Sequence, residues 1–189
     1  MIECTDAPSF KRAIDAISIF ISEGNFRFSE KGIGLRAIDP SQIVLVDCFI
    51  PKESFSTFDL EPTFVGVDVV EFARMLSRSL PEDKLLLDVD ENEIMLRLEG
   101  DFSRNFNLPL IDVSEAEKDI KIPNPNFDAR VEINAKLLKE ALKDAQLFGS
   151  SVIVKLKNKQ FLIEAKGNQG HLKTISKEGK LISIKTSAD

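Results

Sequence analysis

Residues 6–35 read DAPSFKRAIDAISIFISEGNFRFSEKGIGL, and this stretch carries the pattern that decides the fold. Asp6 and Pro8 favour the start of a helix, and apolar residues follow at helical spacing: Phe10, Ile14, Ile17 and Ile21. We expect Gly24 to end the helix. Beyond it, apolar and polar residues alternate on both sides of a tight turn at 30–32, which predicts a β-hairpin.

The same helix-and-hairpin pattern recurs twice along the chain. In the second copy Asp68 caps a helix that Pro81 stops, and a hairpin (85–98) and a strand (102–108) follow; the helix core positions are Val69, Phe72, Leu76 and Leu80. In the third copy Asn134 caps a helix that Gly149 ends, with core positions Leu138, Ala141, Leu142 and Ala145 and strands at 152–156, 161–165 and 171–176. A shift of 128 residues places the apolar pattern of the first copy on the third.

The repeats predict one complete domain and part of another. We expect a first domain at 1–111, an extended interdomain loop at 112–127, rich in polar residues and proline, and an incomplete second domain at 128–189. Residues 1–61 have counterparts at 129–189, whereas the counterparts of 62–111 would lie beyond residue 189.

Composition excludes several classes of protein. The 189 residues are 43% hydrophobic and 30% charged, which is ordinary for a globular chain and unlike a disordered or membrane protein. With 25 Lys+Arg against 31 Asp+Glu, the chain is too acidic to coat nucleic acid indiscriminately. The 14 Phe, without Trp or Tyr, indicate core rather than a stacking platform. Cys4 and Cys48 predict reduced thiols, and we expect a soluble cytoplasmic, nucleoid-associated protein, nuclear if eukaryotic.

Three further stretches resemble a known family. EKGIGLRAIDPSQIVLV (30–46), LPLID (108–112) and IKIP (120–123) are similar to the hairpin and loop signatures of DNA sliding clamps of the proliferating cell nuclear antigen (PCNA) type, archaeal members above all. The resemblance implies an α+β DNA-clamp fold, apparently truncated in its second domain. It also implies a non-enzymatic DNA polymerase processivity factor that encircles duplex DNA and tethers replication and repair proteins.

A clamp needs positive charge toward DNA without reading bases, and each predicted helix has cations on its polar side. By resemblance, the DNA-facing positions are Lys11, Arg12, Arg74, Arg78, Lys136, Lys139 and Lys143. For any one isolated helix, a solvated polar face is the favoured interpretation. Because all three repeats of this acidic protein have a helix with a basic polar side, DNA contact is favoured. Asp15, Glu71 and Glu140 lie among these cations and reduce the positive charge.

The resemblance also implies a partner-peptide groove and a subunit interface. The groove positions are Ile38, Gln42, Ile43, Leu45, Ile120, Ile122 and Pro123, and the alternative is that the isoleucines only tie the loop down. The interface pairs a strand holding Phe102, Arg104, Phe106 and Leu108 with one holding His171, Lys173 and Ile175 in the next subunit, and the alternative is an ordinary core strand.

The expected partners are double-stranded DNA without sequence preference, a DNA polymerase, a clamp loader, other proteins with clamp-binding peptides, and further subunits in a homo- or heterotrimeric ring. No cofactor, metal or catalytic residue is expected, because His171 is the only histidine and the letter match Gly32–Ala37 to a dinucleotide motif lies in a hairpin. Two rivals stay open: a truncated subunit that cannot close a ring and acts as an interaction module, and a small hydrolase using surface carboxylates.

Overall fold

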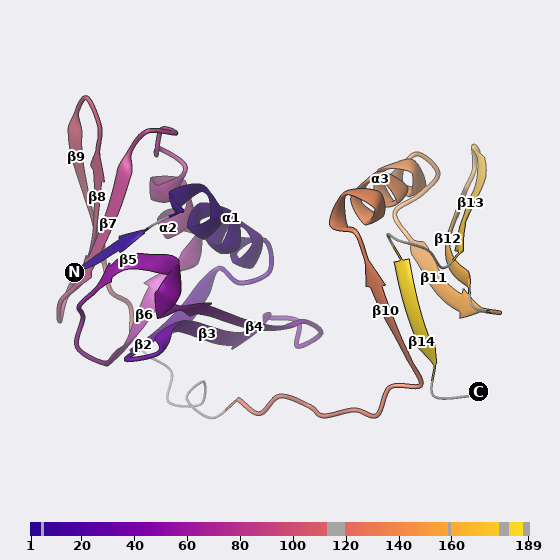
Figure 1. The fold of residues 1–189 in the computed structure, drawn as a ribbon, viewed down its shortest axis with the longest axis horizontal. Coiled ribbons are helices and arrows are strands. Elements are labelled where there is room, and N and C mark those ends of the chain that lie inside the picture. The colour runs from indigo at the N-terminus through magenta and orange to yellow at the C-terminus, as the bar shows by residue number, and fades with distance from the viewer. Residues whose placement is uncertain (5, 113–119, 159, 178–181, 187–189) are drawn as a thin grey trace. The chain divides into compact units, whose positions relative to one another are not determined.

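The computed structural model describes residues 1–4, 6–112, 120–158, 160–177 and 182–186. It divides into two compact units, Met1–Ile122 and Pro123–Asp189. Unit 1 has two helices and the described part of unit 2 has one, in each case packed on antiparallel strands (Figure 1), which confirms the predicted α+β class. The boundary between the units falls inside the expected loop at 112–127.

Unit 1 consists of two halves built in the same order. The elements are β1 (Ile2–Cys4), α1 (Ala7–Ser18), β2 (Glu23–Ser29), β3 (Gly32–Ile38), β4 (Leu45–Pro51), a 3-10 turn (Lys52–Ser54), β5 (Phe55–Phe58), β6 (Thr63–Asp68), α2 (Val69–Leu76), β7 (Lys84–Val89), β8 (Glu93–Glu99) and β9 (Ser103–Pro109). Each half is therefore a strand, a helix, a hairpin and a further strand; the repeat predicts the helix, the hairpin and the strand after it, but not the opening strand.

The two halves exchange their first strands. One sheet has the order β4-β3-β2-β6 and the other β5-β1-β7-β8-β9, so each hairpin pairs with the strand that opens the other half. The pairs correspond: Phe26 lies opposite Val65 and Leu87 lies opposite Ile2, with all four side chains in one core. Unit 1 therefore has an approximate two-fold relation between its halves.

Aromatic side chains hold the two helices together on the core side. Phe72 of α2 makes edge-to-face contacts with Phe10 of α1 and Phe26 of β2, at ring-centroid distances of 6.3 and 6.1 Å. Burying a phenylalanine contributes about 1.5–3 kcal/mol, and such ring pairs add about 0.5–1.5 kcal/mol. The expectation that the phenylalanines form the core holds only in part: Phe10, Phe26, Phe28, Phe55, Phe72 and Phe161 are buried, whereas Phe20, Phe49, Phe102 and Phe127 are exposed.

Unit 2 repeats the first half of unit 1. Its elements are β10 (Ala129–Ile133), α3 (Ala135–Gln146), β11 (Val152–Lys157), β12 (Gln160–Gly167), β13 (Gly170–Lys177) and β14 (Ile182–Thr186). The bounds of α3 are those of α1 moved by 128 residues, which confirms the repeat. The strands form two sheets, β10-β14 and β11-β12-β13, and α3 packs on the core of Phe161, Ile163 and Ala165.

The predicted N-cap residues of all three helices are confirmed, whereas two of the predicted C-terminal helix ends are wrong. Asp6, Asp68 and Asn134 accept hydrogen bonds from the first turns of α1, α2 and α3. α1 ends at Ser18, whereas Gly24 lies in β2, where an added Cβ would come within 3.1 Å of Leu35 Cδ1. α2 ends at Leu76, so Leu80 is outside the helix and exposed.

Candidate nucleic-acid and partner interfaces

The predicted DNA-facing cations of unit 1 lie on or beside two adjacent helices. Arg12 and Arg74 are exposed on the sides of α1 and α2 opposite the core. Arg78 is exposed but lies in the turn after α2, so the prediction that it shares a helix face with Arg74 is wrong. Lys11 Nζ donates to the carbonyl of Ser77, 3.4 Å away at the end of α2, so this lysine also caps the neighbouring helix.

The lysines of unit 2 form one exposed stripe. Lys136, Lys139 and Lys143 lie on the side of α3 away from Ala145, the buried residue of the helix. Lys143 Nζ lies 2.8 Å from Glu140 Oε1. The hydrogen bond from Lys143 is the larger cause, and its positive charge the smaller cause, of the lowered pKa of Glu140. Arg74 is paired in the same way with Glu71, at 2.5 Å. Each ion pair partly neutralises the positive charge of its helix. Lys136 and Lys139 therefore supply most of the positive charge that is left on α3.

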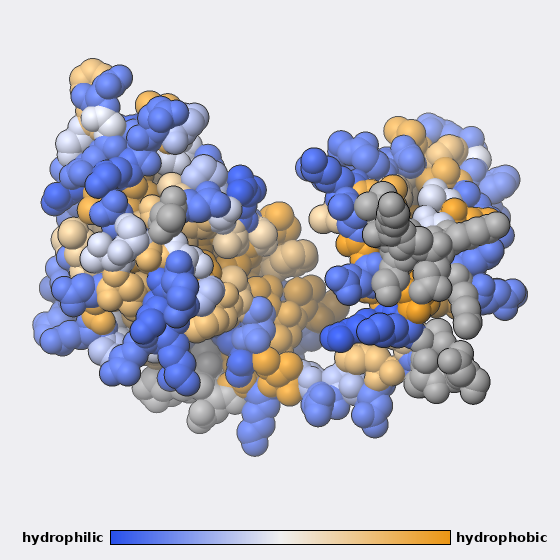
Figure 2. All heavy atoms as spheres, in the orientation of Figure 1, coloured by the Kyte–Doolittle hydropathy of each residue, from blue (hydrophilic) through white to orange (hydrophobic). Residues whose placement is uncertain are grey.

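The predicted groove residues lie around the outer face of the β4-β3-β2-β6 sheet. Ile38, Ile43 and Ile122 are exposed, Ile43 by 83%, while Leu45 and Ile120 are half-buried. Figure 2 shows hydrophobic residues gathered over the region of β3 and β4. Pro123 is exposed and belongs to unit 2. A cluster of exposed isoleucines is a surface that favours a partner.

A hollow of about 360 Å³ lies on the same sheet face, and residue Ile120 of the loop forms part of its wall. Of the seven predicted groove residues only Ile120 lines it; the other walls include Arg27, Arg36, Asp47 and Phe49. Arg36 donates from Nη1 to the Ile120 carbonyl at 3.0 Å and from Nε to Asp47 Oδ1 at 2.9 Å. Arg36 therefore ties the loop to the sheet, a role that sequence reasoning missed.

Asp39 is a second residue that sequence reasoning missed. Its Oδ1 accepts from the amides of Ile43 and Val44 at 2.8 and 2.6 Å, and its Oδ2 accepts from the Ser41 hydroxyl and amide. Gln42 inside this loop has a left-handed φ of 59°. The Asp-Pro pair at 39–40 is a turn signal that could have identified the loop. Asp39 thus fixes how Gln42 and Ile43 are presented.

These hydrogen bonds set a pH dependence for the Asp39 loop. The Ser41 hydroxyl, followed by the backbone amides, lowers the pKa of Asp39 from 3.8 to about 2. Because the folded pKa is depressed, the stabilisation is complete above 3.8 and is lost as the pH falls toward about 2. We expect the Ile43 and Val44 amide NMR shifts to stay constant at neutral pH and to titrate near 2; Asp39→Asn removes the transition. A midpoint at 3.8 would contradict these bonds.

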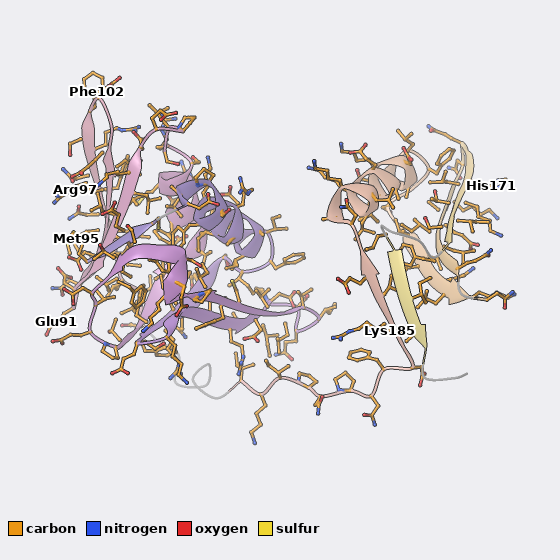
Figure 3. All side chains as sticks on the ribbon, viewed as in Figure 1. Glu91, Met95, Arg97, Phe102, His171 and Lys185 are labelled. Carbon is orange, nitrogen blue, oxygen red and sulfur yellow. The ribbon has the colours of Figure 1, made fainter. Side chains whose placement is uncertain are left out.

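The two predicted interface strands lie at the edges of their sheets. β9 ends the five-stranded sheet of unit 1 and β13 ends the three-stranded sheet of unit 2. Figure 3 places Phe102 at the tip of the β8–β9 hairpin and His171 on β13; Phe102 is 77% exposed and precedes the strand, while Leu108 is buried in the core. Lys173 and Ile175 are exposed on β13.

Arg104 has a structural partner. It forms an ion pair with Asp83, whose side chain is 3% exposed, and donates to the Arg78 carbonyl at 2.8 Å. Removing either partner of such a buried pair is costly, because the other charge is left buried and unpaired. Arg104 thus fixes β9 against the loop after α2.

Other chemistry has little support among the described residues. No three of their His, Cys, Asp and Glu side chains lie close enough to hold a metal ion. Burial raises the pKa of Cys4 to about 12 and also raises that of Cys48, so both free thiols stay protonated near neutral pH. No described helix is long and apolar enough to cross a membrane.

The repeated helix-and-sheet units, with edge strands and cationic helix faces, define the clamp class of protein. Residues 1–117 match the family model "Proliferating cell nuclear antigen, N-terminal domain". The chain is 36% identical over 180 residues to DNA polymerase sliding clamp 1 of Thermococcus kodakarensis and 35% identical to the sliding clamp of Pyrococcus furiosus, covering 93% of this chain and 72% of each relative.

Solved structures give the same result. The PCNA crystal structure from Thermococcus kodakaraensis matches with a TM-score of 0.87 at 29% identity, over 99% of this chain and 78% of that one. PCNA of Entamoeba histolytica, at 23% identity and a TM-score of 0.86, shares the fold. The chain belongs to the proliferating cell nuclear antigen family.

Proposed function

We propose that this chain is a DNA polymerase sliding clamp: copies of it encircle duplex DNA and hold a polymerase and other DNA-processing proteins on it. The observation that carries the proposal is the 180-residue similarity to archaeal proteins named DNA polymerase sliding clamps. The function is mechanical rather than catalytic. A closed ring cannot leave the duplex sideways, so the tethered polymerase stays at high effective concentration near its template.

The proposed ring forms head to tail. β9 of one subunit adds antiparallel to β13 of the next, since both strands are sheet edges among the described residues, and repetition of one such contact closes a ring if the rotation permits. A homo- or heterotrimer is the expected size. The exposed cations on or beside α1, α2 and α3 then face the duplex and contact phosphates without reading bases.

The proposed partner site is the surface around Ile38, Gln42, Ile43, Leu45 and Ile122, with the loop held at Ile120. A short apolar segment of a polymerase, loader or repair protein docks there. Arg36 and Asp39 position the two sides of this surface, so we expect the affinity for partners to depend on these two residues as well.

Primer extension on a singly primed circular template, with a clamp loader and a family B polymerase from a Thermococcus species, tests the function. We expect the chain to lengthen the products made in one binding event. Products of unchanged length, with the loader and polymerase shown to be active with the Thermococcus clamp, would contradict the proposal.

Replacing Arg36 by alanine tests the partner surface separately. The loss of its bond to the Ile120 carbonyl frees the loop, and we expect a fluorescein-labelled clamp-binding peptide to bind about tenfold more weakly, measured by anisotropy. The exposed ion pair with Asp47 contributes at most about 1 kcal/mol to folding, so the melting temperature changes little. Arg36→Lys, which keeps the charge but not the guanidinium fork, is the control and weakens binding partially. Equal affinity in all three proteins would refute the role of Arg36.

A second candidate function is supported by unit 2 alone. Several apolar side chains of unit 2 are exposed, among them Val154 and Leu156, and an interaction module that closes no ring would offer such a surface to a partner. The comparisons do not favour this alternative over the clamp. Light scattering with size-exclusion chromatography separates the two, because only the clamp forms a cyclic oligomer.

A further inference from the structure

The hollow beside Ile120 has a counterpart on the other sheet of unit 1. A hollow of about 200 Å³ lies on the outer face of the β5-β1-β7-β8-β9 sheet. Figure 3 shows Met95 and Arg97 on the side of β8 turned away from α1 and α2. None of the predicted DNA-facing, groove or interface residues lines this hollow. Its walls include Leu86, Asp88, Met95, Arg97, Asn105 and Asn107.

The approximate two-fold relation within unit 1 matches the two hollows residue by residue. Each hairpin contributes two strands to its hollow, and the strand after the hairpin contributes a third. The cross-strand register is the same on both sheets, so side chains at matching positions point into the two hollows. The matching rows are Arg27, Gly34 and Phe49 on the first sheet and Asp88, Met95 and Asn107 on the second.

An arginine is held in the same way in each hollow. Arg36 donates from Nε to Asp47 Oδ1 at 2.9 Å. Arg97 donates from Nε to Asn105 Oδ1 at 3.1 Å. The Nη1 of Arg36 also donates to the Ile120 carbonyl and so seats a loop segment on the sheet. The Nη1 of Arg97 lies 3.6 Å from a carboxylate oxygen, too far for a hydrogen bond, and no described residue takes the place of Ile120.

The second hollow differs from the first in having an apolar floor and acidic surroundings. Leu86 and Met95 form the floor, where the first hollow has an asparagine and a glycine. Acidic side chains outnumber basic groups on this face and at the adjoining β7–β8 turn. They are Glu3, Asp88, Asp90, Glu91, Glu93 and Glu99, against Lys84, Arg97 and the Met1 amino group. Such a face complements an apolar residue with basic neighbours.

We propose that this face is a second docking site for an extended segment, which belongs to a partner protein and has an apolar residue flanked by lysine or arginine. The apolar side chain enters the hollow against Leu86 and Met95. Arg97 donates to a backbone carbonyl of the segment, as Arg36 donates to that of Ile120. The surrounding acids attract the basic flanks.

Binding of a synthetic peptide tests the site in the full chain. The probe is a short fluorescein-labelled peptide with one central leucine, lysine at alternate flanking positions and serine elsewhere, and anisotropy gives its affinity. We expect saturable binding, and binding at least about tenfold weaker when glutamate replaces the lysines of the probe. A lack of saturable binding up to millimolar concentration, or equal affinity of the lysine and glutamate probes, overturns the proposal.

A double-mutant cycle locates the leucine of the probe. Met95→Gln keeps the length of the side chain but removes part of the apolar floor, and we expect it to weaken binding about fivefold. Serine in place of the leucine of the probe should have a similar effect. The two changes together should weaken binding little more than one alone, because they remove the same contact. Losses that multiply would place the leucine elsewhere and contradict the proposal.

Paired arginine variants separate this site from the groove. Arg97→Lys keeps the charge but loses the fork that binds Asn105 and a carbonyl together. We expect it to weaken the probe about fivefold and to leave the clamp-binding peptide and primer extension unchanged. Arg36→Lys is the matched control and should do the reverse. Both arginines are exposed, so the melting temperature should change little.

The arginine variants also give the result that would refute the site. Unchanged affinity of the probe for Arg97→Lys, or an equal loss in Arg97→Lys and Arg36→Lys, overturns the proposal. The probe needs neither DNA nor a ring for binding. A chain that fails in primer extension but binds the probe as described would therefore refute the clamp function and keep this site.

Discussion

Changing Lys136, Lys139 and Lys143 together to glutamate abolishes the stimulation of DNA polymerase and leaves unit 2 folded. The three side chains are exposed on the side of α3 away from its core, so the change affects charge and not packing. Glutamates in place of these lysines repel the DNA phosphates. Because the proposed contacts include none to the bases, nothing compensates for the lost attraction. Product length in primer extension and helix content by circular dichroism are the two measurements.

The matched control reverses three lysines of unit 2 elsewhere. Lys157, Lys166 and Lys185 are exposed on strands, in positions that alternate with the core-facing residues. Their change to glutamate alters the net charge equally and should leave processivity intact. Salt dependence adds a quantitative check, since each lost phosphate contact lowers the slope of log affinity against log salt by about 0.9. If both triple variants behave alike, α3 does not face DNA.

Proline in β9 removes the cyclic oligomer. An edge strand that pairs with a neighbour must donate its outward amides, and proline has none. Successive amides point alternately toward β8 and toward the open edge, so Asn105→Pro and Phe106→Pro differ in which set they interrupt. We expect the variant whose lost amide points toward the open edge to keep its melting temperature while the ring disappears in size-exclusion light scattering and only the monomer remains.

Arg104→Glu is not a clean substitute for proline, because its ion pair with buried Asp83 holds the same strand to the core. The control is Lys121→Glu, which is exposed and outside both edge strands. A ring that persists in the proline variant with unchanged melting would show that β9 is not the subunit contact.

Strong local patterns made most of the fold predictable. The capping residues Asp6, Asp68 and Asn134 and the period of the apolar residues located all three helices, and the alternation around short turns located the hairpins. The predicted helix ends at Gly24 and Leu80 failed because tertiary contacts decided them: Gly24 belongs to a strand that packs against Leu35, and Leu80 follows a turn whose carbonyls are already bonded.

Short strands were not predictable in the same way. β1 and β5 have only three and four residues, too few for a period to stand out, and β6 has a glycine, Gly66, in its middle; pairing with distant partners creates all three strands. The exchange of first strands between halves is equally invisible in the sequence, although the pairing of Ile2 with Leu87 depends on it.

The candidate sites followed from family resemblance more than from pattern. The stripe on α3 was readable from spacing alone, whereas Arg36 bonds to Ile120, 84 residues away in the chain, which only the fold brings within reach. The bonds of Asp39 to Ile43 and Val44 are local, and the Asp-Pro pair was their only signal in the sequence. The DNA-facing, groove and interface assignments stay predictions until the variants above are measured.

The claim that the chain is held on DNA by encircling it is tested most directly by comparing how much of it stays on circular and on linear DNA. The loader places the labelled chain on nicked circular plasmid, the salt is raised until electrostatic contacts are screened, and the chain that remains on DNA is measured before and after one restriction cut. A topological tether predicts persistence on the circle and release through the cut ends. Equal loss from circle and line at the same salt would contradict it.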